Sequence, residues 1–163
     1  MYNNIKKYFL ILYKMEMETG NDDTTPMKKT CFYSSIIFIT NSILALYYNY
    51  LVYSLLFFIL VITSLIVHSN MNIYALVIDK IAIFAIAFYG GYIFFEKCKH
   101  ITSTSQIILA IITVYTFLAT IYLYYYGYIN NAYCYHEDTR IGNLYHSFLH
   151  LISSVGHNII VIL

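Results

Sequence analysis

Charged residues are scarce in this chain. Only 10% of its 163 residues are Asp, Glu, Lys or Arg, whereas a soluble domain carries about 25%. Three long stretches contain none of them: 30–78, 101–136 and 141–163. Hydrophobic residues make up 60% of the chain, and the mean hydropathy is +0.65. This composition excludes an ordinary soluble domain and indicates an integral, multi-pass membrane protein whose partner is the lipid bilayer.

Several other residue types are rare or absent. The chain has no Trp and one Pro. Its three cysteines, Cys31, Cys98 and Cys134, are scattered and form no Cys-x-x-Cys pair, so the sequence indicates neither a disulfide framework nor a thiolate zinc site. The net charge is only +1, without a basic patch, which argues against a nucleic-acid partner.

The hydrophobic runs predict an all-α fold, a polytopic bundle of about five transmembrane helices. A span needs about 20 apolar residues to cross the hydrocarbon core. Residues 1–30 form a polar N-terminal segment, and 31–163 form the transmembrane domain. The five expected spans are 31–48, 50–68, 72–95, 102–127 and 143–163. Cytoplasmic loops are richer in Lys and Arg, and counting these residues favours a cytoplasmic N-terminus.

Five polar residues interrupt the apolar runs: Ser64, His68, Asp79, His146 and His150. Polar and ionisable side chains inside a membrane are candidates for functional sites because their burial in lipid is costly. With five spans, the loop between spans two and three lies on the same membrane face as the loop between spans four and five. All five residues are close to these loops. The sequence therefore predicts that they share one layer near one face.

The spacing of the histidines is typical of a metal site. His146 and His150 are four residues apart, so both project from one face of a helix and can bind one ion. His68 completes a set of three ligands and leaves a fourth tetrahedral position for water, as in catalytic zinc sites. Asp79 is then the candidate general base or the residue that orients a ligand. Ser64 is the candidate donor to a developing oxyanion.

Less specific interpretations remain open for each of these residues. A lone His-x-x-x-His motif is more often structural than metal-binding. Asp79 and Lys80 can form a local ion pair, or Asp79 can bond a facing helix while Lys80 extends to the interface. Three further histidines are expected outside the site. His157 is expected to bond a neighbouring helix, and His136 and His100 are expected in loops.

The motif Ser64-x-x-x-His68, followed after eleven residues by Asp79 and later by His146-x-x-x-His150, resembles the alkaline ceramidases. The segment 144–156 is also similar to the last helix of that family. These enzymes belong to the CREST superfamily of membrane hydrolases. The resemblance implies a zinc-dependent amidase that converts ceramide to a sphingoid base and a fatty acid in an ER or Golgi membrane. It also implies that His68, His146 and His150 bind the zinc ion, with Ser64 and Asp79 as catalytic partners.

Members of that family have seven spans, whereas five are expected here. The alternatives are a related membrane lipid hydrolase, a protein like the progestin and adipoQ receptors, or a non-catalytic membrane protein. A haem-binding electron carrier, with His68 and either His146 or His150 as axial ligands, is a further alternative.

Overall fold

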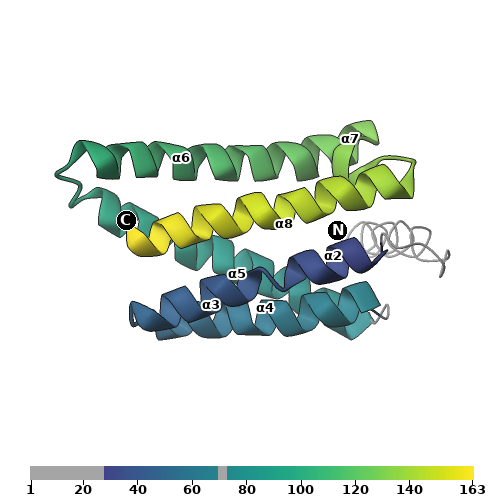
Figure 1. Cartoon of the computed structure of the whole chain (residues 1–163), viewed down its shortest axis with the longest axis horizontal. Coiled ribbons are helices and arrows are strands. Elements are labelled where there is room, and N and C mark those ends of the chain that lie inside the picture. Colours follow the sequence, from purple (N-terminus) through teal and green to yellow (C-terminus); the bar gives the residue numbers. More distant parts are fainter. Residues whose placement is uncertain (1–27, 70–72) are drawn as a thin grey trace, which may run out of the picture.

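The described part of the chain is almost entirely helical. The computed structural model describes residues 28–69 and 73–163, and in these ranges the backbone consists of helices joined by turns and short loops, with no strand (Figure 1). Most of the predicted polar segment 1–30 lies outside the described residues. Its last three residues are helical, so the first helix begins before the predicted boundary. The all-α prediction is confirmed.

Seven α-helices, one of them only four residues long, and two other short helical segments form the bundle in the described ranges. They are α2 (Lys28–Ser35), α3 (Phe38–Tyr47), α4 (Leu51–Ser69), α5 (Ile73–Cys98), α6 (Thr104–Ile121), the π-helix η1 (Tyr122–Tyr126), α7 (Gly127–Asn130), the 3₁₀ helix η2 (Tyr133–Tyr135) and α8 (Thr139–Ile162).

Four of the helical segments are long and apolar enough to cross a membrane. They are Thr30–Tyr47, Leu51–Ser69, Ile73–Cys98 and Thr104–Tyr135, and they correspond to the first four predicted spans. Helix α8 has 24 residues, or about 36 Å at 1.5 Å per residue, but it is not among these four. A fifth span therefore stays a prediction.

The first predicted span is divided in two. Helix α2 ends at Ser35 and α3 begins at Phe38, with a turn between them. The hydroxyl groups of Ser34 and Ser35 both bond the carbonyl oxygen of Cys31, at 3.0 and 2.8 Å. Hydroxyl groups that bond back to a carbonyl in the preceding turn often bend helices. The first predicted span, 31–48, is therefore present as Thr30–Tyr47 but contains a turn that the sequence did not reveal.

The turn between α3 and α4 is tight, as the single residue between the predicted spans 31–48 and 50–68 requires. Asn49 has a φ of 64°, in the left-handed region that Asn tolerates better than most residues. The amide of Tyr50 donates to the carbonyl of Ala45 at 2.8 Å. This geometry ends α3 and returns the chain directly into α4.

Helix α5 is longer than the sequence suggested. The predicted span ends at residue 95, but the helix continues to Cys98. Lys97 donates to the carbonyl oxygen of Val161 near the end of α8, at 2.5 Å. A lysine near a helix C-terminus is favourable because the final carbonyl groups there carry partial negative charge. This contact joins the last turn of α5 to the end of α8.

The fourth predicted span is continuous with a π-helix. Helix α6 passes into η1 at Tyr122, and the left-handed Asn131, with a φ of 49°, ends α7.

The last helix, α8, starts at Thr139, earlier than the predicted residue 143. Asp138 is its N-cap, since its carboxylate accepts a hydrogen bond from the amide of Arg140 at 2.8 Å.

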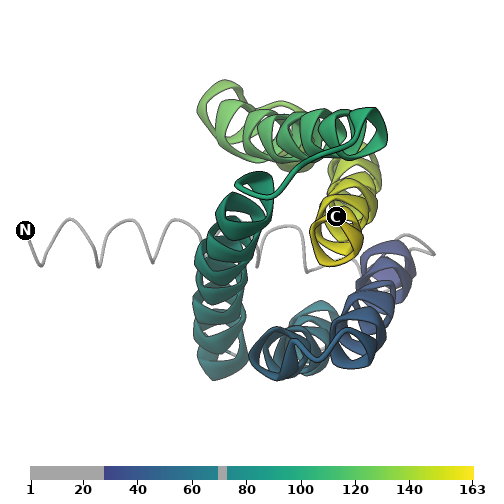
Figure 2. The ribbon, with the colours of Figure 1, turned by 90° about the vertical axis from the view of Figure 1, so that its left-hand side faces the viewer.

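Helix α8 lies between the two halves of the bundle. It packs against α6 on one side and against α2 and α3 on the other, while α4 packs against α3 and α5. Figure 2, a view along the bundle, shows this order, with α6 and α3 on opposite sides of α8. The main core is buried between α3, α4, α5 and α8, around Tyr53, Phe57, Ile86 and Ile160. Helix α6 buries only Thr113 of its own side chains.

Candidate metal centre

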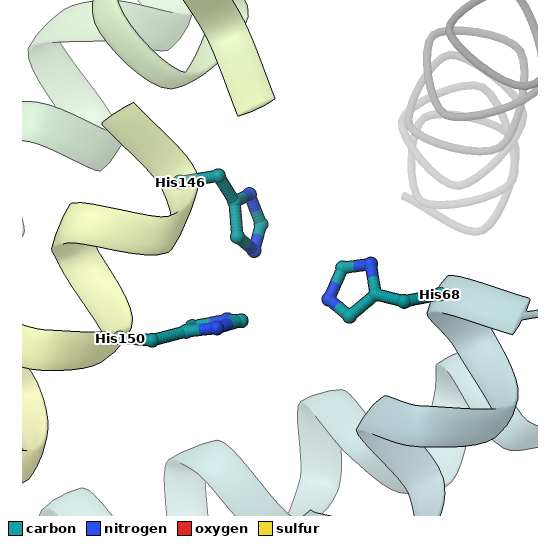
Figure 3. A group of neighbouring side chains, drawn as sticks. All are labelled: His68, His146 and His150. Carbon is teal, nitrogen blue, oxygen red and sulfur yellow. The ribbon is translucent and has the colours of Figure 1, made fainter. Parts of the chain in front are cut away.

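Three histidines from two helices converge at one end of the bundle. Each of His68, His146 and His150 offers one ring nitrogen, and these nitrogens all lie within 4.8 Å of one another. The ring centroids are 5.3 Å apart for His68 and His146, 5.6 Å for His68 and His150, and 4.8 Å for His146 and His150. Figure 3 shows that His146 and His68 each direct a nitrogen into the space between the three rings. The structure therefore brings together all three predicted ligands.

The helix pattern explains why these three side chains meet. His146 and His150 are one turn apart in α8, so both project from the same face. His68 lies in the last turn of α4. The end of α4 and the beginning of α8 are at the same end of the bundle (Figure 1), as counting the spans predicted. The cluster will be called the His triad.

His150 is the most deeply held member of the triad. Its side chain is buried, whereas His68 and His146 are half-buried. The Nδ1 atom of His150 lies 2.8 Å from the hydroxyl oxygen of Ser34 in α2. The ring of Phe38 packs edge-on against it, with centroids 5.3 Å apart. These two contacts fix the orientation of the imidazole ring.

Ser64 is buried one turn below His68 in α4. Its hydroxyl oxygen lies 3.1 Å from that of Ser35, and Ser35 can donate its own proton to the Cys31 carbonyl. In that arrangement Ser64 donates to Ser35 and keeps its lone pairs available. The predicted catalytic role of Ser64 stays a prediction.

Asp79 is held by a facing helix. Its Oδ1 accepts a hydrogen bond from Thr63 of α4 at 3.1 Å, and its Oδ2 lies 3.8 Å from the ammonium of Lys80. Lys80 also lies over the ring of Tyr124, 5.9 Å from its centroid. Both contacts of Asp79 match the alternatives left open by the sequence, a bond to a facing helix and a local ion pair. In any catalytic role, Asp79 would act while its carboxylate keeps the contacts with Thr63 and Lys80.

The other histidines lie where the sequence places them. His157 is buried in the middle of the bundle, and its Nδ1 is hydrogen-bonded to the hydroxyl group of Tyr53 in α4, which confirms the predicted bond between helices. His136 lies in the loop before α8 and accepts a hydrogen bond from the amide of Asp138 at 2.9 Å. His100 lies in the turn after α5. None of the three belongs to the His triad.

Sequence reasoning missed the side chains that support the site. Ser34 and Ser35 contact His150 and Ser64, and Thr63 contacts Asp79. Hydroxyl groups in membrane helices commonly bond across to neighbouring helices. The adjacent pair Ser34-Ser35 in an apolar run was therefore a usable signal, although it does not reveal the partner.

The donor set fits a transition-metal ion. Neutral imidazole suits zinc, copper, iron and nickel, whereas calcium and magnesium prefer oxygen ligands. Three histidines are a known ligand set for catalytic zinc. The group consists of three imidazoles contributed by two packed helices, so His68, His146 and His150 can hold such an ion.

Comparisons with known proteins identify no relative. No protein-family model, no curated protein and no solved structure matches this chain.

Proposed function

We propose that this protein is a zinc-dependent hydrolase of the membrane that cleaves the amide bond of a ceramide-type lipid. One observation carries the proposal: three imidazole nitrogens lie within 4.8 Å of one another, in a chain with four helices that are apolar enough to cross a bilayer. The resemblance of the Ser64, His68, Asp79, His146 and His150 pattern to the alkaline ceramidases supplies the substrate class.

We also propose that α8 is a fifth crossing. It is similar in length to α4 and α5 and lies alongside α3 and α6. Its lower hydropathy comes from polar side chains, several of which are bonded within the bundle. Ser154 and Asn158 bond α3, and His157 bonds α4. A helix that buries its polar face against other helices does not need to be apolar on every side.

In this proposal the chain's residues have distinct roles. The His triad holds the ion, which when bound supplies Lewis-acid activation of water and of the substrate carbonyl. The Oδ atoms of Asp79 accept a proton from the water, and the hydroxyl group of Ser64 exchanges its bond to Ser35 for one to the carbonyl oxygen of the amide, to which it donates. Water adds to the carbonyl carbon and the carbon–nitrogen bond breaks. The proton then passes to the leaving amine, giving a sphingoid base and a fatty acid.

The alternatives fit the geometry less well. A haem places a flat macrocycle between two axial rings, whereas the three rings here have similar mutual separations of 4.8 to 5.6 Å. Such an arrangement suits one small ion. A non-catalytic membrane protein would not need three imidazole nitrogens within 4.8 Å of one another.

The decisive experiment measures metal and reaction in the same preparations. The full chain is purified in detergent, and its zinc content is determined for the wild type, His146→Ala and His100→Ala. We expect about one zinc ion per wild-type chain, its loss in His146→Ala because one of three ligands is removed, and its retention in His100→Ala, whose histidine lies in a distant turn.

Fatty-acid release from ceramide is measured in parallel. Release by the wild type and by His100→Ala, but not by His146→Ala or Asp79→Ala, is expected. Equal and near-zero zinc in all preparations rules out the metal centre. If the protein binds zinc and releases fatty acid from a glycerolipid ester but not from ceramide, its substrates are esters and not amides.

A further inference from the structure

Ser34 is the one side chain outside the His triad with a short hydrogen-bond contact to one of its members in the described ranges. Its hydroxyl oxygen lies 2.8 Å from Nδ1 of His150. The two residues belong to α2 and α8 and are 116 positions apart in the sequence. This bond decides which nitrogen of His150 can act as a ligand, because a neutral imidazole carries a proton on one nitrogen and a lone pair on the other.

The direction of the bond follows from the second contact of Ser34. A serine hydroxyl group has one proton to donate. The carbonyl oxygen of Cys31 lies 3.0 Å from the Ser34 oxygen and can only accept. When Ser34 gives its proton to Cys31, its oxygen accepts the N–H of His150 Nδ1. The Nε2 atom then carries the lone pair that a metal ion requires.

The opposite arrangement is incompatible with ligation. If Ser34 donated to Nδ1, a neutral His150 would carry its proton on Nε2 and would have no lone pair left for an ion. Hydrogen bonds that a ligating histidine makes through its other nitrogen commonly set its tautomer and raise its basicity. The Cys31 carbonyl oxygen thus accepts the Ser34 proton. The Ser34 oxygen can then accept the proton on Nδ1 of His150, and Nε2 can bind the ion.

We propose that Ser34 is a positioning residue of the metal centre, which accepts a proton from Nδ1 of His150 and so presents Nε2 to the ion. This inference rests on the proposed metal site and adds a residue from the first helix to it. The divided helix supports the assignment, since α2 ends immediately after Ser34 and Ser35. The same turn therefore holds a metal ligand through Ser34 and the candidate catalytic Ser64 through Ser35.

The chain offers a matched control in Ser42. Its hydroxyl group also bonds between helices, to the carbonyl and hydroxyl oxygens of Ser54 at 2.9 and 3.1 Å. It lies two turns further along the same predicted span and belongs to the contact between α3 and α4. Replacing either serine by alanine removes one interhelical hydroxyl group, but only Ser34 touches the triad.

The test compares zinc affinity with the stability of the metal-free protein. Wild type, Ser34→Ala, Ser34→Thr and Ser42→Ala are purified as full chains in detergent. Their zinc dissociation constants are measured by competition with a chromogenic chelator, and their melting temperatures in excess chelator. We expect Ser34→Ala to bind zinc about 10- to 100-fold more weakly, the usual effect of losing such a partner. Ser34→Thr, which keeps the hydroxyl group, should bind nearly as tightly as wild type.

The outcomes separate the two proposals. Ser42→Ala should bind zinc as wild type does, and the metal-free melting temperatures of Ser34→Ala and Ser42→Ala should be alike. If Ser34→Ala binds zinc as tightly as Ser42→Ala, or if Ser34→Thr is as weak as Ser34→Ala, the positioning role is wrong while the metal site stands. If the wild type binds no zinc, both proposals are wrong.

Discussion

At the scale of single residues, the interior is defined by paired polar groups. In the described ranges, no buried side-chain nitrogen or oxygen lacks a hydrogen-bond partner. Tyr53 and His157 form one such pair between α4 and α8, surrounded by the rings of Phe57 and Phe117, with centroids 5.2 and 4.9 Å from that of His157. Removing one member of a buried pair typically costs about 1–3 kcal/mol, so these contacts constrain the bundle strongly.

The close approach of α5 to this pair gives a prediction about two adjacent glycines. A Cβ atom on Gly90 would clash with the hydroxyl oxygen of Tyr53 and lie 3.2 Å from Nδ1 of His157. Tyr53 is fully buried and cannot swing aside. Gly90→Ala is therefore expected to destabilise the protein by about 1–3 kcal/mol, the range for inserting a carbon into a packed core. Thermal unfolding in detergent measures the loss.

Gly91 provides the control for this substitution. A Cβ atom there meets nothing within 4 Å, and alanine is favoured over glycine in a helix by about 1 kcal/mol. Gly91→Ala should therefore leave the melting temperature unchanged or raise it slightly. Equal melting temperatures for the two variants would contradict the close packing of α5 against Tyr53.

At the scale of elements, α8 depends on a polar contact with α3. Asn41 is buried, donates to the carbonyl oxygen of Ser154 at 2.8 Å and to Oδ1 of Asn158 at 2.9 Å, and accepts from the Ser154 hydroxyl group at 2.7 Å. Such bonds hold membrane helices together because unpaired polar groups are unfavourable in lipid. The contact lies along the same helix that carries His146 and His150, so it also helps to hold the His triad in register.

This contact can be measured with a double-mutant cycle. Asn41→Ala and Ser154→Ala are each expected to reduce the free energy of unfolding by about 1–2 kcal/mol, with a coupling of about 0.5–1.7 kcal/mol, as found for hydrogen bonds between membrane helices. Unfolding in mixed micelles of increasing denaturing detergent provides the values. Ser69→Ala is the control, because that exposed hydroxyl group bonds the carbonyl of Ile66 in its own helix. A coupling near zero would mean that the two side chains do not hold α8 in place.

At the scale of the whole molecule, the bundle has two chemically different ends. The His triad lies where α4 ends and α8 begins, whereas the tight turn between α3 and α4, the link between α5 and α6 and the C-terminus are at the other end (Figure 1). The side chains around the bundle are largely apolar and exposed, for example Phe88 at 80% and Tyr115 at 68%. A large apolar surface is expected where a protein faces lipid.

Membrane topology tests this arrangement. With five crossings, including α8, the two termini lie on opposite sides of the bilayer. The excess of Lys in the N-terminal segment then favours a cytoplasmic N-terminus. Reporter tags on each end should show the N-terminal tag protected from external protease and the C-terminal tag exposed to it. Both tags on one side would mean that α8 does not cross the membrane.

The sequence by itself determined that the fold is helical and which side chains share one face of each helix. The long stretches without charge can satisfy their backbone groups in lipid as helices, and the four-residue step from His146 to His150 places both on one face by helix geometry alone. Counting helices also placed His68 at the same end. These features follow from local backbone geometry and from the alternating direction of successive helices, and both can be inferred from the order of residues in the sequence.

The tertiary structure alone decided which side chains face one another across helices. The Ser34 bond to His150, the Thr63 bond to Asp79 and the divided first span depend on how each helix is rotated and where it crosses its neighbours. Many small packing contacts together set these rotations and crossings, and no spacing within one helix encodes them. For this reason the ligands of the candidate metal centre were predictable from the sequence, whereas the residue that orients His150 was not.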